Sequence, residues 1–255
     1  MAISKAQIDR LGERLRRGPH TESDLRLLDD YRRSFAEAYE VVVGTIRRRG
    51  EFPTGRPAKS TDSIVEKLRR ESIRLSQMQD IAGCRVVVAN VVQQEKFVAS
   101  LRADFPGAAV VDRRDKPSHG YRAVHLIAEV SGKPMEVQVR TSLQHLWAEV
   151  SEKCSDVLDP AIKYGGGPES WRVSLQSSSD AVAAYERLET TMLWAFEKLE
   201  ARVNEQPKLS AMAEAVRGEL TRLQGEMAVM WHKIAEQLNE MIASLDPLPP
   251  KGQEE

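Results

Sequence analysis

The spacing of apolar positions changes twice along the chain, from a helical period to a strand period and back. From Thr21, with Asp24 three positions on as in a capping box, apolar side chains recur every three or four residues. This spacing predicts one long helix that ends near Gly50. We therefore expect residues 1–50 to form N-terminal helices.

The middle of the chain has the pattern of a sheet. The segment CRVVVANV is an almost continuous apolar run, typical of a strand covered on both faces. Two later segments alternate between apolar and polar residues around a short turn with Gly132, which predicts an antiparallel hairpin. Helices are expected over 92–104 and from Ser142 to about Val157. Strands are expected at 84–91, 108–112, 121–130 and 135–141. This order predicts an α+β fold with a mixed, largely antiparallel sheet flanked by helices.

The helical period returns after a glycine-rich break at 163–168. One helix is expected from Trp171 to about Val203, within a C-terminal helical region over 169–245. Residues 246–255 are expected to be a disordered tail. The last helix has an apolar stripe that fits a bundle, a coiled coil or a subunit contact. Its members are Leu209, Met212, Val216, Leu220, Leu223, Met227, Met230, Ile234, Leu238, Met241 and Leu245.

Composition narrows the function only a little. The formal net charge of the 255 residues is −1, so any nucleic-acid-binding surface would be local. Cys84 and Cys154 are too few for a disulfide framework or a cysteine-based zinc site. The chain has no run of 18 apolar residues and no signal-peptide pattern near Met1, so we expect a cytoplasmic protein without membrane contact.

One stretch, residues 47–74, is strongly basic, with nine Lys or Arg against four Asp or Glu. A charge run is usually a solvated helix face. Here a turn containing glycine and proline leads into a short helix expected after Asp62. The free N–H groups and positive dipole at a helix start suit an anion such as a phosphate.

Two charged residues flank the start of the first expected strand. Asp80 precedes it and Arg85 lies just inside it, with Gly83 between them. A structural ion pair is the plain interpretation. The functional one is that Asp80 holds Mg²⁺, that Arg85 faces a nucleotide, and that Gly83 lets the backbone come close.

The hairpin is expected to carry a polar wall. Alternation puts Tyr121 and His125 on one face of the first strand, and Glu136, Gln138 and Arg140 on one face of the second. A solvated sheet face would alternate as well, but with more Lys and Thr. An aromatic ring beside a carboxylate and a guanidinium suits nucleotide recognition better.

Taken together, five motifs in this order resemble the synthetase domain of the RelA/SpoT family. The resemblance spans roughly residues 40–165, and the synthetase core is expected at 51–168. The chain is similar to the small single-domain alarmone synthetases. The motifs are R-x2-K-x3-S-x3-K from Arg56, D-I-A-G-C-R from Asp80, G-Y-R-A-V-H from Gly120, E-V-Q-V-R-T from Glu136 and L-Q-H-L-W-A-E from Leu143.

The resemblance implies a nucleotidyltransferase-like fold and transfer of pyrophosphate from ATP, with Mg²⁺, to the 3′-hydroxyl of GDP or GTP. It places Asp80 and Glu136 at the metal and the reacting hydroxyl. ATP would be held by Arg56, Lys59, Ser63, Lys67 and Arg85, with the two arginines beside the adenine. The acceptor would be held by Tyr121, stacked on its base, and by His125, Gln138, Arg140 and His145.

This sequence departs from the family pattern near the acceptor. His119 stands where Asn is expected, His145 replaces another Asn, and Ser151-Glu152 replaces Glu-His. The spacing from Arg56 to Lys59 is one residue longer than usual. These departures open one alternative, a toxic small synthetase that modifies the 3′-CCA end of tRNA or an adenosine nucleotide. A separate alternative is a non-catalytic nucleotide sensor, against which the presence of both Asp80 and Glu136 argues. The C-terminal helices could join copies of the chain, bind an antitoxin, or cover the site.

Overall fold

The computed structural model describes residues 3–205 and 210–246, except for the side chains of Arg56 and of residues 210–212. The described chain forms two compact units. The first contains residues up to Val86, 98–111 and 125–139; the second contains 87–97, 112–124 and residues from Arg140 on. Residues 247–255, most of the tail expected to be disordered, lie outside the described residues.

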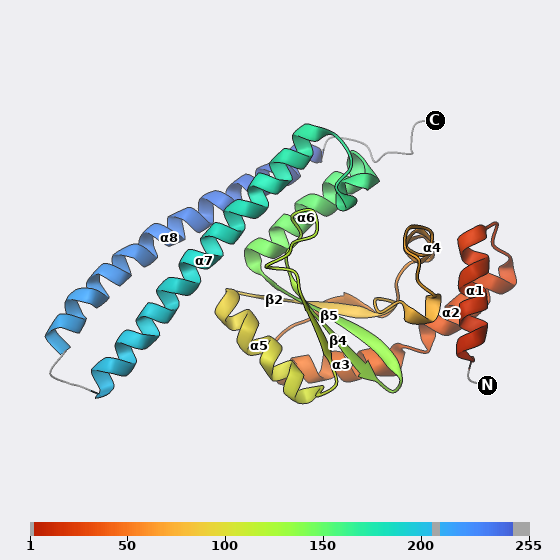
Figure 1. Cartoon of the computed structure of the whole chain (residues 1–255), viewed down its shortest axis with the longest axis horizontal. Helices are drawn as coiled ribbons and strands as arrows, with labels where there is room; N and C mark the ends of the chain where they lie inside the picture. Colours follow the sequence, from red (N-terminus) through yellow and green to blue (C-terminus); the bar gives the residue numbers. More distant parts are fainter. Residues whose placement is uncertain (1–2, 206–209, 247–255) are drawn as a thin grey trace. The chain divides into compact units, whose positions relative to one another are not determined.

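Helices and strands follow one another as Figure 1 labels them. The helices are α1 (Lys5–Arg17), α2 (Glu22–Arg33), α3 (Ala36–Arg48), α4 (Thr61–Arg70), α5 (Val91–Asp104), α6 (Ser142–Val157), α7 (Glu169–Glu205) and α8 (Ser210–Leu245). The strands are β1 (Thr54–Arg56), β2 (Gly83–Val88), β3 (Ala109–Asp112), β4 (Val124–Val130) and β5 (Lys133–Thr141).

The single helix expected from Thr21 to Gly50 is wrong, because the structure has a break between α2 and α3. At the break the Ser34 hydroxyl donates to the Tyr31 carbonyl at 2.6 Å, an alternative to the helical hydrogen bond. The turn brings the rings of Tyr31 and Phe35 edge to face, with centroids 5.2 Å apart. The Lys133 ammonium lies 4.9 Å from the Phe35 centroid, so the break anchors these helices to the start of β5.

The sheet has five strands in the order β1-β2-β5-β4-β3. It is mixed and flanked by helices, which confirms the predicted fold class. Sequence reasoning expected a turn at β1, and the structure has a short edge strand there, antiparallel to β2, with Gly55 opposite Cys84. A Cβ on Gly55 would lie 2.5 Å from the Gly83 carbonyl oxygen, so this pairing requires glycine.

The two faces of β2 are covered unequally. Along β2, Cys84, Val86 and Val88 are buried while the residues between them are half-buried. The expectation of full cover on both faces is therefore wrong for β2: one face joins the core and the other remains open for polar side chains. A Cβ built on Gly83 would meet the Glu136 carbonyl oxygen at 2.7 Å. The close approach predicted at Gly83 is thus to β5.

The strand expected over 121–130 begins only at Val124. Before it, His119 and Gly120 have positive φ angles of 52° and 89° and make a tight loop. The Tyr121 N–H donates to the Ser118 carbonyl at 3.0 Å inside that loop. Tyr121 is therefore held by a turn rather than by the hairpin.

In the second unit, α6, α7 and α8 share an apolar core, and α7 and α8 lie side by side (Figure 1). The apolar stripe of α8 is only partly used in that core: Leu238 and Leu245 are fully buried, whereas Val216 and Met230 are exposed. The part of the stripe that packs thus packs within the chain. Leu209 and the side chain of Met212 lie outside the described residues.

Among the residues that the structure describes, we find no helix both long enough and apolar enough to cross a membrane.

We predict that Gly83→Ala lowers the free energy of unfolding by about 1–3 kcal/mol, because the new methyl group would overlap the β5 backbone. Urea unfolding measures this loss. Gly107→Ala is the matched control, since a Cβ there meets nothing within 4 Å. Equal stability of the two variants would contradict the close approach.

Candidate active site

The first cluster of predicted site residues gathers around Asp80, in the turn before β2. Lys59 Nζ donates to Asp80 Oδ2 at 2.7 Å, and Lys67 Nζ donates to Asp80 Oδ1 at 2.8 Å. Lys59 lies in the loop after β1, where its backbone N–H donates to the Ile81 carbonyl at 2.7 Å. Lys67 comes from the last turn of α4. Three segments that are separate in sequence therefore meet on one carboxylate.

Asp80 stays ionised in this setting. Its side chain is only 19% exposed. Burial alone would raise the pKa of the carboxyl, but the positive charges of Lys59 and Lys67 outweigh burial and hold the pKa below its ordinary value. Two cations around one anion leave the cluster with a net positive charge, which favours a polyanionic ligand.

Glu136, on β5, is the second carboxylate. His125 Nδ1 lies 2.9 Å from Glu136 Oε1, and Gln138 Nε2 donates to Oε2 at 2.9 Å. Burial pushes the pKa of Glu136 upward, and the bond from His125 together with that from Gln138 brings it below its ordinary value. The hairpin alternation predicted from sequence is thus confirmed for these three side chains.

The two carboxylates are close enough to interact. The negative charge of Asp80 acts on Glu136 and opposes the lowering of its pKa. Both residues belong to the first unit, and Gly83, three positions after Asp80, packs against the Glu136 backbone.

This donor set fits a magnesium ion. Mg²⁺ prefers oxygen ligands and is commonly bound by one or two carboxylates together with substrate phosphates and water. Within residues 3–205 and 210–246, no group of three or more His, Cys, Asp or Glu side chains could hold a metal ion. Asp80 and Glu136 thus suit an ion that arrives with a nucleotide better than a permanent structural metal.

Other residues predicted to hold ATP lie on the elements around this cluster. Ser63 is in the first turn of α4, and its N–H donates at 3.3 Å to the hydroxyl of Ser60, the N-cap of the helix. Arg85 lies on the half-buried face of β2. Arg56 is in β1, and its side chain lies outside the described residues.

In the second unit, two residues predicted to hold the acceptor contact each other. Arg140 Nη2 donates to the Tyr121 hydroxyl at 3.0 Å, and the guanidinium carbon lies 5.1 Å from the centre of the Tyr121 ring. Arg140 is 3% exposed, so it holds the ring from within the protein. His145, on α6, lies 3.5 Å from Glu149 one turn later and faces a carboxylate.

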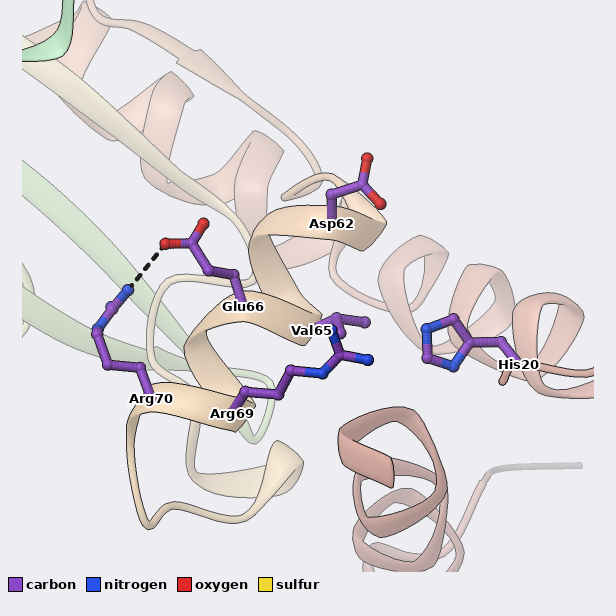
Figure 2. Close-up of a pocket in the computed structure, with 6 residues that line it drawn as sticks. All are labelled: His20, Asp62, Val65, Glu66, Arg69 and Arg70. Atoms are coloured by element: carbon purple, nitrogen blue, oxygen red, sulfur yellow. Dashed lines mark hydrogen bonds and ion pairs between the residues drawn. The ribbon is translucent and has the colours of Figure 1, made fainter. Parts of the chain in front are cut away.

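A hollow of about 500 Å³ lies beside α4, but it contains none of the predicted site residues (Figure 2). It is lined by His20, Asp62, Val65, Glu66, Arg69 and Arg70. Figure 2 shows the ion pair between Glu66 and Arg70, at 3.3 Å. Two acids balance two arginines in this hollow, so it lacks the excess positive charge of the Asp80 cluster.

Residues 55–155 match the family described as "Region found in RelA / SpoT proteins". This segment is similar to that RelA/SpoT region. It contains both carboxylates, both lysines and the Tyr121–Arg140 pair, and it confirms the resemblance drawn from the five motifs.

Several known proteins are similar to parts of the chain. An uncharacterized protein of Mycobacterium tuberculosis is 36% identical over 138 residues, 52% of this chain and 50% of that protein. A probable chloroplastic GTP diphosphokinase of Arabidopsis thaliana is 33% identical over 95 residues, 36% of this chain and 13% of that protein. The chain thus spans half the length, or less, of these curated relatives. The crystal structure of small alarmone synthetase 1 from Bacillus subtilis has a TM-score of 0.52 and 27% identity, over 70% of this chain and all of that one.

Sequence reasoning missed a second set of buried polar residues, in the second unit. Gln94, Gln144 and Glu186 are each at most 7% exposed, and they are joined by hydrogen bonds. The signal for Gln144 was present, because it occupies the third position after Thr141 in a capping box. Glu186 had no local signal within its long helix.

We predict that the Asp80 cluster makes the free energy of unfolding depend on pH in the acidic range. The pKa of Asp80 in the folded protein is below its ordinary value. Its ionised form therefore stabilises the fold at pH values above that ordinary value, and the contribution is lost as the pH falls through the lowered pKa. In metal-free buffer, Asp80→Asn should cost about 1–3 kcal/mol near neutral pH, because two lysines lose their acceptor. As the pH falls through the lowered pKa of Asp80, the stability curve of Asp80→Asn should approach that of the wild type.

Urea unfolding over a pH series measures both curves. Asp62→Asn serves as the control, because it removes an exposed carboxylate from α4, the helix that carries Lys67. Parallel curves for the wild type and Asp80→Asn would show that the cluster does not stabilise the ionised form.

Proposed function

We propose that the protein transfers the β,γ-pyrophosphate of ATP to the 3′-hydroxyl of GDP or GTP. The observation that carries the proposal is the pair of ionised, largely buried carboxylates, Asp80 and Glu136, with two lysines on the first. Two relatives support the acceptor. One is named a probable GTP diphosphokinase. The other, small alarmone synthetase 1 from Bacillus subtilis, has a solved structure bound to its product pppGpp, with a TM-score of 0.50 and 26% identity.

ATP would bind at the positive side of the first cluster. Lys59 and Lys67 would turn from Asp80 to the triphosphate, since phosphate oxygens offer more negative charge than one carboxylate. Ser63, in the first turn of α4, would add its hydroxyl near a helix start that attracts anions. Arg56 and Arg85 would flank the adenine, as the family resemblance implies.

With its lysines on the phosphates, Asp80 would have both oxygens available for Mg²⁺, which it would share with Glu136. The bound ion would supply positive charge to the phosphates at the transition state, a contribution of several kcal/mol. The carboxylates also fix where ATP sits, because ion and triphosphate bind together.

The reaction forms one bond to the β-phosphorus and breaks another. The acceptor 3′-oxygen attacks the β-phosphorus, the bond to the oxygen bridging the α- and β-phosphates breaks, and AMP leaves with that oxygen. The hydroxyl proton goes to the Glu136 carboxylate, which His125 and Gln138 hold in place. A loose transition state makes little demand on base strength, so a carboxylate with a lowered pKa suffices.

The acceptor would be recognised by Tyr121, with its ring stacked on the base. Arg140 fixes that ring by its hydrogen bond to the hydroxyl and by its position at the ring. The family resemblance also assigns His125, Gln138 and His145 to acceptor binding.

We expect Asp80→Asn and Glu136→Gln to reduce pyrophosphate transfer by about 10²- to 10⁴-fold each, because each removes charge needed at the reacting phosphorus or the hydroxyl. The assay uses γ-labelled ATP and Mg²⁺ with GDP, GTP, AMP, ATP or deacylated tRNA in separate reactions. Glu129→Gln is the control, since it removes an exposed carboxylate from β4.

The panel also separates the alternatives. Label on GDP or GTP that depends on both carboxylates supports the proposal. Label on tRNA or an adenosine nucleotide alone would keep the transferase and overturn the guanosine acceptor. Binding of ATP with no transfer to any acceptor would favour a nucleotide sensor.

Tyr121→Ala should raise the KM for the acceptor about 5- to 150-fold and leave the KM for ATP within about twofold, since stacking on a base is worth about 1–3 kcal/mol. Tyr121→Phe keeps the ring and loses the bond to Arg140, so its effect should be smaller. Initial rates with each substrate varied in turn measure both constants. Equal effects on the two substrates would contradict a role in acceptor binding alone.

A further inference from the structure

A buried carboxylate lies beyond the RelA/SpoT region. Glu186 is on α7, thirty-one positions past the end of the 55–155 match, and is 7% exposed. Burial raises the pKa of Glu186, while hydrogen bonds from Thr141 and Gln144 and the charges of Arg122 and Arg114 oppose the rise. A buried carboxyl usually has a structural partner or a role near a site.

Glu186 holds the first turn of α6. The Thr141 hydroxyl donates its single proton to Glu186 Oε1 at 2.5 Å, and the same hydroxyl accepts the Gln144 N–H at 3.2 Å as the N-cap of α6. Gln144 Nε2 donates to both Glu186 oxygens, at 3.0 and 3.1 Å. The carboxylate thus sets the direction of the Thr141 hydroxyl and orients the Gln144 amide.

The first turn of α6 continues directly from the acceptor residue on β5. Arg140 precedes Thr141, and its guanidinium donates to the Tyr121 hydroxyl. Arg140 is buried, so a shift of Thr141 would move the guanidinium relative to the ring.

α7 also forms hydrogen bonds with the loop that carries Tyr121. Ser179 lies seven positions before Glu186, two turns back on the same face of α7. Its hydroxyl donates to the Gly120 carbonyl at 2.6 Å and accepts Arg122 Nε at 3.1 Å. The residues on both sides of Tyr121 are therefore bound to α7.

The side-chain amides of Gln94 and Gln144 connect these two sets of hydrogen bonds. Gln94 Nε2 donates to Gln144 Oε1 at 2.9 Å, and Arg114 Nη1 donates to Gln94 Oε1 at 3.3 Å. Arg122 in turn donates to the Arg114 carbonyl. One continuous polar network thus runs from Glu186 through the start of α6 to the segment before Tyr121.

We propose that Glu186 is a positioning residue for the acceptor site: through Thr141 and Gln144 it fixes Arg140 and the loop that presents Tyr121. The inference rests on the proposed function, in which Tyr121 and Arg140 hold the acceptor. It makes α7 a part of the acceptor site rather than only an arm for assembly.

A purely structural role predicts something else. If Glu186 only joined α6 to α7, its loss would lower stability and reduce the amount of active protein, which changes kcat and leaves each KM as it was. A positioning role changes the KM for the acceptor selectively, because a small displacement of binding groups weakens the contacts they make.

The test compares three variants of the full chain. Glu186→Ala removes the acceptor of the Thr141 proton. Glu186→Gln keeps one oxygen for that proton at the same size. Glu189→Ala, three positions on, is the matched control, because it removes a half-buried carboxylate that accepts the Tyr185 hydroxyl at 3.1 Å.

Two measurements are needed. Hydrogen exchange reports on the backbone amides of Arg113 and Tyr121, which donate to Ala123 at 2.9 Å and to Ser118 at 3.0 Å. Steady-state kinetics give the KM for ATP and for GDP, and calorimetry gives the Kd of GDP alone.

We expect Glu186→Ala to speed exchange at 113–123 and to raise the KM and Kd for GDP by about 10- to 100-fold, with the KM for ATP within about twofold. Glu186→Gln should recover part of the loss, and Glu189→Ala should match the wild type.

Unchanged exchange at 113–123, or an equal rise in both KM values, would overturn the inference. Transfer by the wild type to none of the acceptors would instead end the proposed function. Exchange would then still show whether Glu186 holds the loop, and unchanged exchange would overturn that part as well.

Discussion

Each oxygen of the Asp80 carboxylate accepts a hydrogen bond from a lysine ammonium group, and the rest of the candidate site depends on this arrangement. It joins the loop after β1, the end of α4 and the turn before β2 at one point. Each partner lies mostly out of water, so the cost of burial is offset only while the charges remain paired. In the proposed function, a polyphosphate with its metal ion would replace these pairs without leaving a charge unpaired.

The placement of the second carboxylate follows from backbone packing. Because β2 and β5 are neighbours and position 83 has no side chain, the Glu136 backbone comes against the start of β2, close to Asp80. The negative charge of Asp80 reaches Glu136, which would cost energy without counter-charges or hydrogen-bond donors. Two lysines offset this repulsion at Asp80. The His125 imidazole and the Gln138 amide offset it at Glu136.

Much of this was predictable from sequence where local chemistry decides. The start of α6 follows from the Thr141 cap, and the hairpin follows from alternation around Gly132. The gathering of His125, Glu136 and Gln138 follows from the same alternation. By contrast, the break at Ser34 depends on ring packing against Lys133, a contact distant in sequence. The short strand β1 depends on its pairing with β2 rather than on its own residues.

Glu186 shows the same limit of prediction from sequence. A glutamate in a long helix is usually solvated, and nothing beside it in the sequence indicates burial. Its proposed role depends on hydrogen bonds from Thr141 and Gln144. These residues lie more than forty positions earlier and come close to Glu186 only in the folded chain. The motifs therefore predicted the residues proposed to contact the substrates. They missed Glu186, which is proposed to position two of those residues.

The most direct test of the account is a crystal structure of the protein with Mg²⁺ and a non-hydrolysable ATP analogue. The account predicts one ion within about 2.1 Å of an oxygen from both Asp80 and Glu136, with Lys59 and Lys67 moved onto the phosphates. An ion bound away from either acid, or a triphosphate bound while both lysines remain on Asp80, would contradict it.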